Sequence, residues 1–251
     1  MRVQNTWHVA FLALSMLGFF TATPVAAQSN HNTVQLDRVT DEEVDVIGRW
    51  EDTPLWRGKK QTSTVHYPLE ESAKRCDNRN CTNGCTIGFG YNLGAHTREM
   101  IRTDFNQAGI PTQKTDALVA LAKLTGTKAV AQCGKNAPAQ SSFPQLTREE
   151  SVRLLRFKIQ SYKDDVVQRA RREGVLAMLN SAQLAVLVAL DYQSPVLSSK
   201  ATQLWRQLAQ GNMPAVQSNI RHNSGTHLEP ALQRRRNWEA RYFIKGAGLI
   251  S

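Results

Sequence analysis

The stretch CTIGFGYNLG, residues 85–94, contains the segment TIGFGYNL, residues 86–93, in which β-branched or aromatic residues alternate with glycine. This alternation predicts a short strand or hairpin, and Gly88 and Gly90 let another backbone or a ligand come close. The residues before it, 53–79, mix prolines, glycine and polar residues without a clean period, which predicts irregular structure. The residues after it carry helical signals to the end of the chain. The sequence therefore predicts a small irregular β-lobe, residues 51–95, beside a helical body.

A capping box marks the first helix. Thr40 is followed three residues later by Glu43, and an apolar face continues from there. This pattern predicts a short helix that ends near Trp50 or Glu51.

Two later segments give the strongest helical signals. Thr147 and Glu150 form a second capping box, and an apolar stripe at steps of three and four follows it. Residues 182–190 (AQLAVLVAL) are apolar nearly all round. A helix of that composition is typical of the buried centre of a domain.

The first 27 residues have the pattern of a secretory signal peptide. Arg2 precedes an apolar run over residues 9–20, and Val25 and Ala27 supply the small residues of a cleavage site. The run is too short to span ~30 Å of hydrocarbon comfortably. A retained N-terminal anchor is the alternative interpretation.

After the expected signal peptide, the sequence indicates two further parts. We expect residues 28–39, which are polar, to form a flexible lead-in and residues 40–251 to form one folded domain. After cleavage the protein would be periplasmic or secreted, without membrane insertion.

Four cysteines would then meet an oxidising compartment: Cys76, Cys81, Cys85 and Cys133. Two disulfides are expected, but their pairing stays open among three possibilities. A zinc site is the rival, yet the spacing matches no common zinc finger. We therefore expect no metal.

The formal net charge of +10 and the pI near 9.7 suggest an anionic partner. The positive charge by itself is compatible with three anionic partners: a bacterial wall polymer, a membrane surface and nucleic acid. No helix-turn-helix, zinc-finger or RNA-recognition signature is present, so nucleic acid is disfavoured. The 41% apolar content excludes a disordered chain.

Four segments resemble the phage-type lysozymes of glycoside hydrolase family 24, in particular their pesticin-like branch. Residues 85–94 are similar to that branch's T-I-G-[FY]-G-[FY]-D-L-G motif. Residues 146–155, 179–193 and 233–246 are similar to its later helices, in the same order and at similar spacing. The resemblance covers roughly residues 41–248.

The resemblance implies an α+β, lysozyme-like fold: a mostly helical body with a small irregular β-lobe forming a cleft. It also implies cleavage of the β-1,4 bond between N-acetylmuramic acid and N-acetylglucosamine in peptidoglycan, without a cofactor. The family's general acid is a Glu at the end of the first helix, which points to Glu51. The competing carboxylates are Glu42, Glu43, Glu70 and Glu71.

The resemblance assigns roles to further residues. Thr86 matches the Thr that holds the attacking water, and Gly88, Gly90, Tyr91 and Gln193 fall at substrate-facing positions. Arg235 and Glu239, at i and i+4, are expected to form a structural pair in the last helix. Trp50, Trp56 and Trp205 either stack on sugars or, more commonly, pack in a core.

The second carboxylate of the family is missing. Its two usual positions hold Asn80 and Asn92 here, so Asn92 is expected to hold water beside Thr86. An amide cannot accept the proton of the attacking water. Asp77 is the only carboxylate between Cys76 and Thr86 and is either a substitute or a loop residue.

Two functional hypotheses follow. The first is an exported muramidase with peptidoglycan as substrate and a possible immunity or inhibitor protein as partner. The second is a catalytically inactive lysozyme-fold protein that binds wall glycan or another protein, for which the two Asn residues argue.

Overall fold

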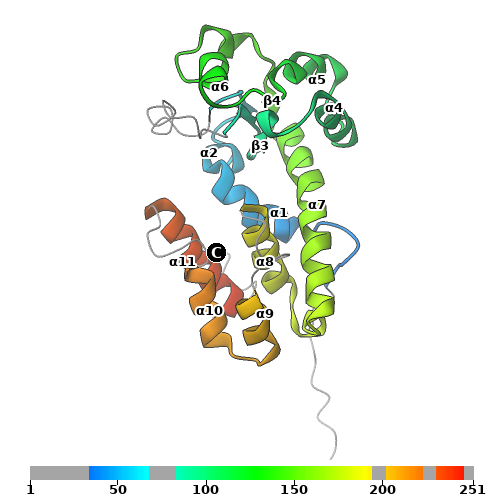
Figure 1. The fold of residues 1–251 in the computed structure, drawn as a ribbon, viewed down its shortest axis with the longest axis vertical. Helices are drawn as coiled ribbons and strands as arrows, with labels where there is room; N and C mark the ends of the chain where they lie inside the picture. The colour runs from blue at the N-terminus through cyan, green and yellow to red at the C-terminus, as the bar shows by residue number, and fades with distance from the viewer. Residues whose placement is uncertain (1–33, 68–82, 194–201, 223–229, 246–251) are drawn as a thin grey trace, which may run out of the picture. The chain divides into compact units, whose positions relative to one another are not determined.

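The computed structural model describes residues 34–67, 83–193, 202–222 and 230–245 (Figure 1). The described chain is mostly helical and carries two small two-stranded sheets, which makes it an α+β protein. Residues 1–33, and with them the expected signal peptide and half of the lead-in, lie outside the described residues. No helix within the described ranges is long and apolar enough to cross a membrane.

The N-terminal elements, through the irregular lobe, are α1 (Asp41–Glu51), α2 (Thr53–Trp56), β1 (Thr62–Ser63), β2 (Thr86–Ile87), β3 (Tyr91–Asn92) and the 3-10 helix η1 (Leu93–Ala95). Next come α4 (Arg98–Gln107), α5 (Thr112–Leu118), η2 (Val119–Leu121), α6 (Gly126–Cys133), η3 (Pro138–Ser142) and β4 (Leu146–Thr147). The remaining elements are α7 (Arg148–Arg172), η4 (Leu176–Met178), α8 (Ser181–Gln193), α9 (Thr202–Ala209), α10 (Met213–His222) and α11 (Pro230–Lys245).

The capping box at the start of α1 is confirmed. The Thr40 hydroxyl accepts from the Glu43 N–H, and the Glu43 carboxylate accepts from the Thr40 N–H. The helix ends at Glu51, as the sequence predicts. Asp52 then begins α2 by accepting from the Leu55 N–H at 3.1 Å, so the chain turns directly after Glu51.

The predicted hairpin is also present. Strands β2 and β3 pair antiparallel, with Thr86 opposite Asn92 and Ile87 opposite Tyr91. The turn between them needs positive φ angles, +63° at Gly88 and +88° at Gly90, which glycine adopts without steric cost.

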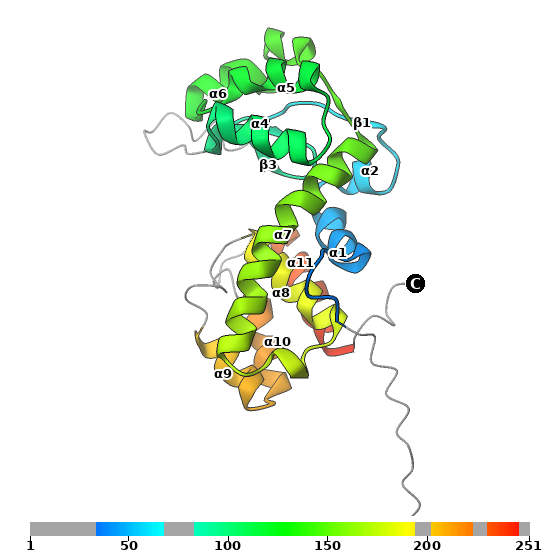
Figure 2. The same ribbon diagram turned by 90° about the vertical axis from the view of Figure 1, so that its right-hand side faces the viewer.

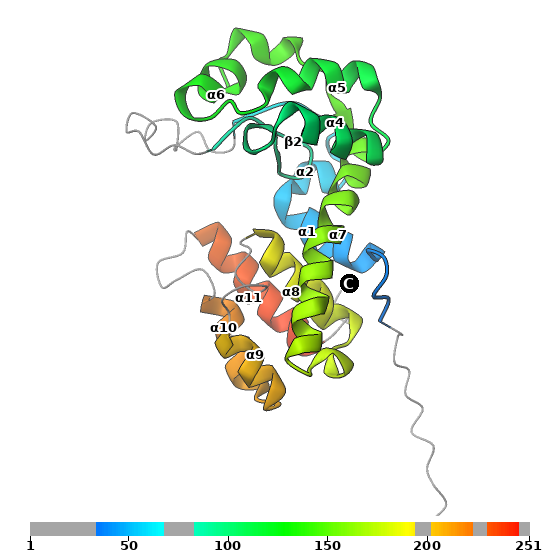
Figure 3. The same cartoon turned by 45° about the vertical axis from the view of Figure 1, so that its right-hand side comes forward.

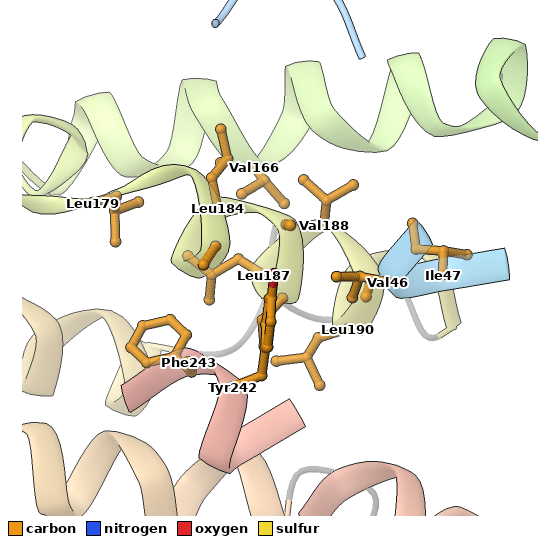
Figure 4. Close-up of a cluster of buried hydrophobic side chains, with 14 of the residues drawn as sticks. Val46, Ile47, Val166, Leu179, Leu184, Leu187, Val188, Leu190, Tyr242 and Phe243 are labelled. Atoms are coloured by element: carbon orange, nitrogen blue, oxygen red, sulfur yellow. The ribbon is translucent and has the colours of Figure 1, made fainter. Parts of the chain in front are cut away.

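The core is organised around α8. The apolar residues within 182–190 are all buried, which confirms the predicted central helix. Figure 4 shows α8 residues such as Leu187 and Leu190 between Ile47 of α1 and Tyr242 of α11. Burying one such aliphatic side chain contributes about 1.5–3 kcal/mol, so this cluster is a main source of stability.

Helix α7 contributes side chains to two hydrophobic clusters. The capping box of Thr147 and Glu150 starts it as predicted, and it runs for 25 residues beside α1 and α8 (Figures 2 and 3). Ile159 joins the cluster around α8, whereas Leu154 joins a second cluster of the hairpin with α4, α5 and α6. One helix therefore fixes the hairpin relative to the central helix.

The described part of the lead-in, residues 34–39, is held against α7. Lys163 is fully buried, and its Nζ donates to the carbonyls of Gln35 at 2.5 Å and Arg38 at 2.6 Å and pairs with Glu43. A buried ammonium requires such partners, because an unpaired charge in the interior is very costly. Within the expected lead-in, residues 28–39, the part that the structure describes is thus tied to α7 by these hydrogen bonds.

A disulfide joins Cys85, at the start of the hairpin, to Cys133 at the end of α6. One of the two expected disulfides is thereby present, and Cys76 and Cys81 lie outside the described residues. The bridge ties the hairpin to the second cluster.

Replacing both bridged cysteines (C85A with C133A) should lower the free energy of unfolding by about 2–4 kcal/mol, because the bridge closes a loop of sequence separation 48. The midpoint of urea unfolding measures the loss. Adding a reductant should then affect this variant less than the parent, and an unchanged midpoint would contradict the stabilising role.

Candidate active site

Glu51, the last residue of α1, faces the hairpin. Its Oε1 accepts from Arg235 Nη1 of α11 at 2.7 Å. Its Oε2 accepts no hydrogen bond from the described residues and lies beside Gly90, where a Cβ atom would come within 3.1 Å of it. The glycine is therefore required both by its φ of +88° and by the space that the carboxylate needs.

The other carboxylates of α1 are engaged elsewhere. Glu42 accepts from the Tyr242 hydroxyl at 2.6 Å, and Glu43 pairs with Lys163 in the core. Glu70 and Glu71 lie outside the described residues. Among the described competitors, Glu51 is thus the one that reaches the hairpin.

A cavity of about 320 Å³ opens between Glu51, the hairpin, α7 and the end of α8. Its lining residues are Glu51, Gly90, Tyr91, Asn92, Ala95, His96, Lys158, Tyr162, Tyr192 and Gln193. Five residues that the sequence pointed to, distant in the chain, are brought together here: Glu51, Gly90, Tyr91, Asn92 and Gln193.

Thr86 and Gly88 are not among the lining residues. Thr86 is buried, with its hydroxyl directed at the Gly84 carbonyl and its backbone paired with His66 on the edge opposite Asn92. The Gly88 N–H donates to Ser63 Oγ at 2.7 Å. The expected water-holding role of Thr86 and the expected sugar contact of Gly88 are therefore not supported, because both residues are used within the lobe.

Asn92 reaches the cavity and also has a structural task. Its Oδ1 accepts from the Ala95 N–H at 3.2 Å and caps η1. Asp is as good a cap as Asn, so the local structure does not require the amide. Asn80 and Asp77 lie outside the described residues.

Glu51 belongs to a buried ionic network. Arg235 Nε donates to Glu239 Oε1 at 2.8 Å, which confirms the expected pair, and its Nη1 reaches Glu51. Arg236 bonds the other oxygen of Glu239 and the side-chain oxygen of Gln193. Two carboxylates and two guanidiniums thus balance their charges.

The network shifts the pKa values of its two arginines in opposite directions. Burial alone would lower the pKa of Arg235, but Glu239 and Glu51 outweigh it and leave that pKa above its usual value. For Arg236, burial outweighs the attraction of Glu239 and lowers the pKa. Arg235 is therefore a fixed positive charge beside Glu51.

Two tyrosines form the wall next to Glu51. The Tyr192 hydroxyl donates to the Phe89 carbonyl at 2.8 Å, and its ring packs edge-on against Tyr162 at 5.2 Å. Burial, followed by the charge of Glu51, raises the pKa of Tyr192 well above its usual value. Tyr192 therefore stays neutral and holds the hairpin turn in place.

The other wall contains residues that sequence analysis missed. The Tyr91 hydroxyl donates to Asp104 at 2.8 Å, Lys158 reaches the same carboxylate at 3.3 Å, and the rings of Tyr91 and His96 lie 4.8 Å apart. His96 and Lys158 lie in different elements with no shared motif. The only local feature of the sequence that could have indicated His96 as a cavity residue is its position four residues after Asn92.

The three tryptophans considered as sugar-stacking candidates, Trp50, Trp56 and Trp205, pack against other side chains of the protein. Trp205 is fully buried in the core, Trp56 packs against Phe89, and Trp50 packs against Trp238. None of the three lines the cavity, so stacking on a sugar there is not supported. Within the described residues, no group of three or more His, Cys, Asp or Glu side chains is arranged to hold a metal ion.

The fold and this cavity define an α+β protein with a carboxylate site between a helix end and a hairpin. The chain belongs to the family described as "Domain of unknown function (DUF8812)", which matches residues 72–240. No curated protein matches the chain. The matched region includes the hairpin, Gln193 and the arginines of α11, while Glu51 precedes it.

Removing the central carboxylate of the network should destabilise the protein. We expect E239Q to lower the free energy of unfolding by about 3–5 kcal/mol, because Arg235 and Arg236 would lose their buried counter-charge. The partly exposed pair of Arg169 and Glu173 has the same spacing, so E173Q is a matched control with a loss below about 1 kcal/mol. Thermal and urea unfolding measure both losses. If E239Q and E173Q lost the same free energy of unfolding, the role of the network would be contradicted.

Proposed function

We propose that this protein is an exported muramidase that hydrolyses the β-1,4 bond between N-acetylmuramic acid and N-acetylglucosamine in peptidoglycan. Glu51 is the general acid. The proposal combines the resemblance of four ordered sequence segments to phage-type lysozymes with the placement of Glu51 in a cavity beside the hairpin.

The observation that carries the proposal is the divided environment of the Glu51 carboxylate. Oε1 is fixed by Arg235 at 2.7 Å, while Oε2 faces the cavity at Gly90 without a hydrogen-bond partner among the described residues. This arrangement orients the carboxyl group and leaves one oxygen accessible from the cavity, and a general acid must reach the glycosidic oxygen with such an oxygen.

The remaining lining residues suit a sugar. The side-chain oxygen of Gln193 accepts from Arg236, which leaves the amide nitrogen of Gln193 as a donor for a sugar hydroxyl. Tyr91 and Tyr162, which line the cavity, provide aromatic surface. The net charge of +10 would favour encounter with the anionic wall. An inhibitor or immunity protein would act by covering this cavity.

A glycan-binding protein without turnover is the second candidate function. Glu51 is the one carboxylate among the described residues that line the cavity. The sequence resemblance aligns Asn92 with the position of the second carboxylate. Binding would require only the shape and the hydrogen-bond donors.

The decisive assay is release of soluble muropeptides from purified peptidoglycan by residues 28–251, with mass spectrometry of the ends produced. We expect muramic-acid reducing ends from the parent and about a 10²- to 10⁴-fold loss in E51Q, since Gln cannot supply a proton. E99Q, which changes a fully exposed carboxylate on α4, is the matched control and should keep parent activity.

Absence of products from the parent, with retained pelleting on insoluble wall, would refute hydrolysis and favour the binding function. Equal activity of E51Q and the parent would refute the role of Glu51.

Asn92→Asp should raise the rate of muropeptide release. The new carboxylate keeps the cap on η1 and adds a group able to accept a proton from water. An unchanged melting temperature would show that the fold tolerates the change. A lower rate at every pH would contradict a position beside the attacking water.

A further inference from the structure

We propose that His96 is the general base of this site and takes the place of the absent second carboxylate. The inference rests on the proposed hydrolytic function and goes beyond it, because nothing in the sequence resemblance assigns a role to this histidine. It names which side chain accepts the proton of the attacking water.

The geometry places His96 in the same cavity as Glu51. Glu51 Oε2 lies against Gly90, and the His96 ring lies against the ring of the next residue, Tyr91. The cavity volume of about 320 Å³ far exceeds the ~15 Å³ that one water requires. An acid and a base on different walls, with space for a water, is the arrangement that an inverting glycosidase uses.

His96 is held in position by its surroundings. The backbone N–H of His96 donates to the Leu93 carbonyl at 3.2 Å, and the Tyr91 ring, against which the imidazole packs, is fixed by a hydrogen bond from the Tyr91 hydroxyl to Asp104 at 2.8 Å. Lys123 donates to the carbonyl of the preceding Ala95 at 3.2 Å. These contacts hold the backbone of His96 and the aromatic ring beside its imidazole, which limits where the imidazole can lie in the cavity.

Charged groups from three elements face the ring. Burial, then Lys158 of α7 and Lys123 of the loop after η2, lower the pKa of His96, while Asp104 of α4 opposes them. The neutral form, with one ring nitrogen free to accept a proton, therefore persists below the usual histidine pKa of ~6.5. A base poised in this range is effective near neutral pH.

In the proposed step, the oxygen of one water molecule replaces the glycosidic oxygen at C1. Glu51 donates its proton to the glycosidic oxygen as the bond from that oxygen to C1 breaks. The water oxygen forms a new bond to C1, and the water proton passes to a ring nitrogen of His96. The products are a reducing end and a free sugar hydroxyl, and a proton returned from His96 through solvent restores Glu51.

The test compares pH–rate profiles of muropeptide release for the parent, H96Q, N92D and the double variant H96Q/N92D. H222Q is the matched control, because His222 is an exposed histidine on α10 that does not line the cavity. Circular dichroism and melting temperature establish that each variant is folded.

We expect parent activity to fall as the pH drops through the lowered pKa of His96. H96Q should lose about 10²- to 10⁴-fold in rate and lose this acidic limb, whereas H222Q should match the parent. N92D in the H96Q background should restore activity, with the limb moved toward ~4, where carboxylates titrate.

Three results would overturn the inference. If the parent is active and H96Q has the same pH–rate profile, His96 is excluded as the base while the muramidase function still stands. An inactive parent with an active N92D would show that His96 does not serve as a base. A parent and N92D both inactive at every pH would refute the proposed function itself and the inference with it.

Discussion

The ion pair between Glu51 and Arg235 is the contact on which the site depends. It joins residues 184 positions apart and connects the end of α1 to α11. Arg235 is itself fixed by Glu239, whose other oxygen holds Arg236. Because Arg235, Arg236 and Glu239 are buried, each of these three charges is tolerated only with its partner present. The last helix therefore determines how the carboxylate of the first helix is oriented.

The hairpin imposes the complementary constraint. Gly90 allows the Glu51 carboxylate to lie beside the backbone, and Tyr192 fixes the same turn through the Phe89 carbonyl. The disulfide and α7 join the hairpin to both hydrophobic clusters. The elements that line the cavity are thus held together by contacts between residues far apart in the chain.

Local signals predicted much of the fold. The capping boxes at Thr40 and Thr147, the alternation of residues 86–93 and the apolar run 182–190 each correspond to an observed element. Such signals act within a few residues, so they can be interpreted without knowledge of tertiary contacts. The candidate site was predicted less completely: Glu51, Gly90, Tyr91, Asn92 and Gln193 meet at the cavity, whereas Thr86 and Gly88 do not.

The sequence by itself determined which segments form helices and a hairpin, and that a carboxylate ends the first helix. Only the tertiary structure decided which side chains share the cavity, because neighbouring strands and helices consume some polar groups and leave others exposed. Thr86 is enclosed by strand pairing with His66, while His96 and Lys158 reach the cavity from separate elements. Contacts between residues far apart in the chain leave no local periodicity, and they determine the chemistry of the site.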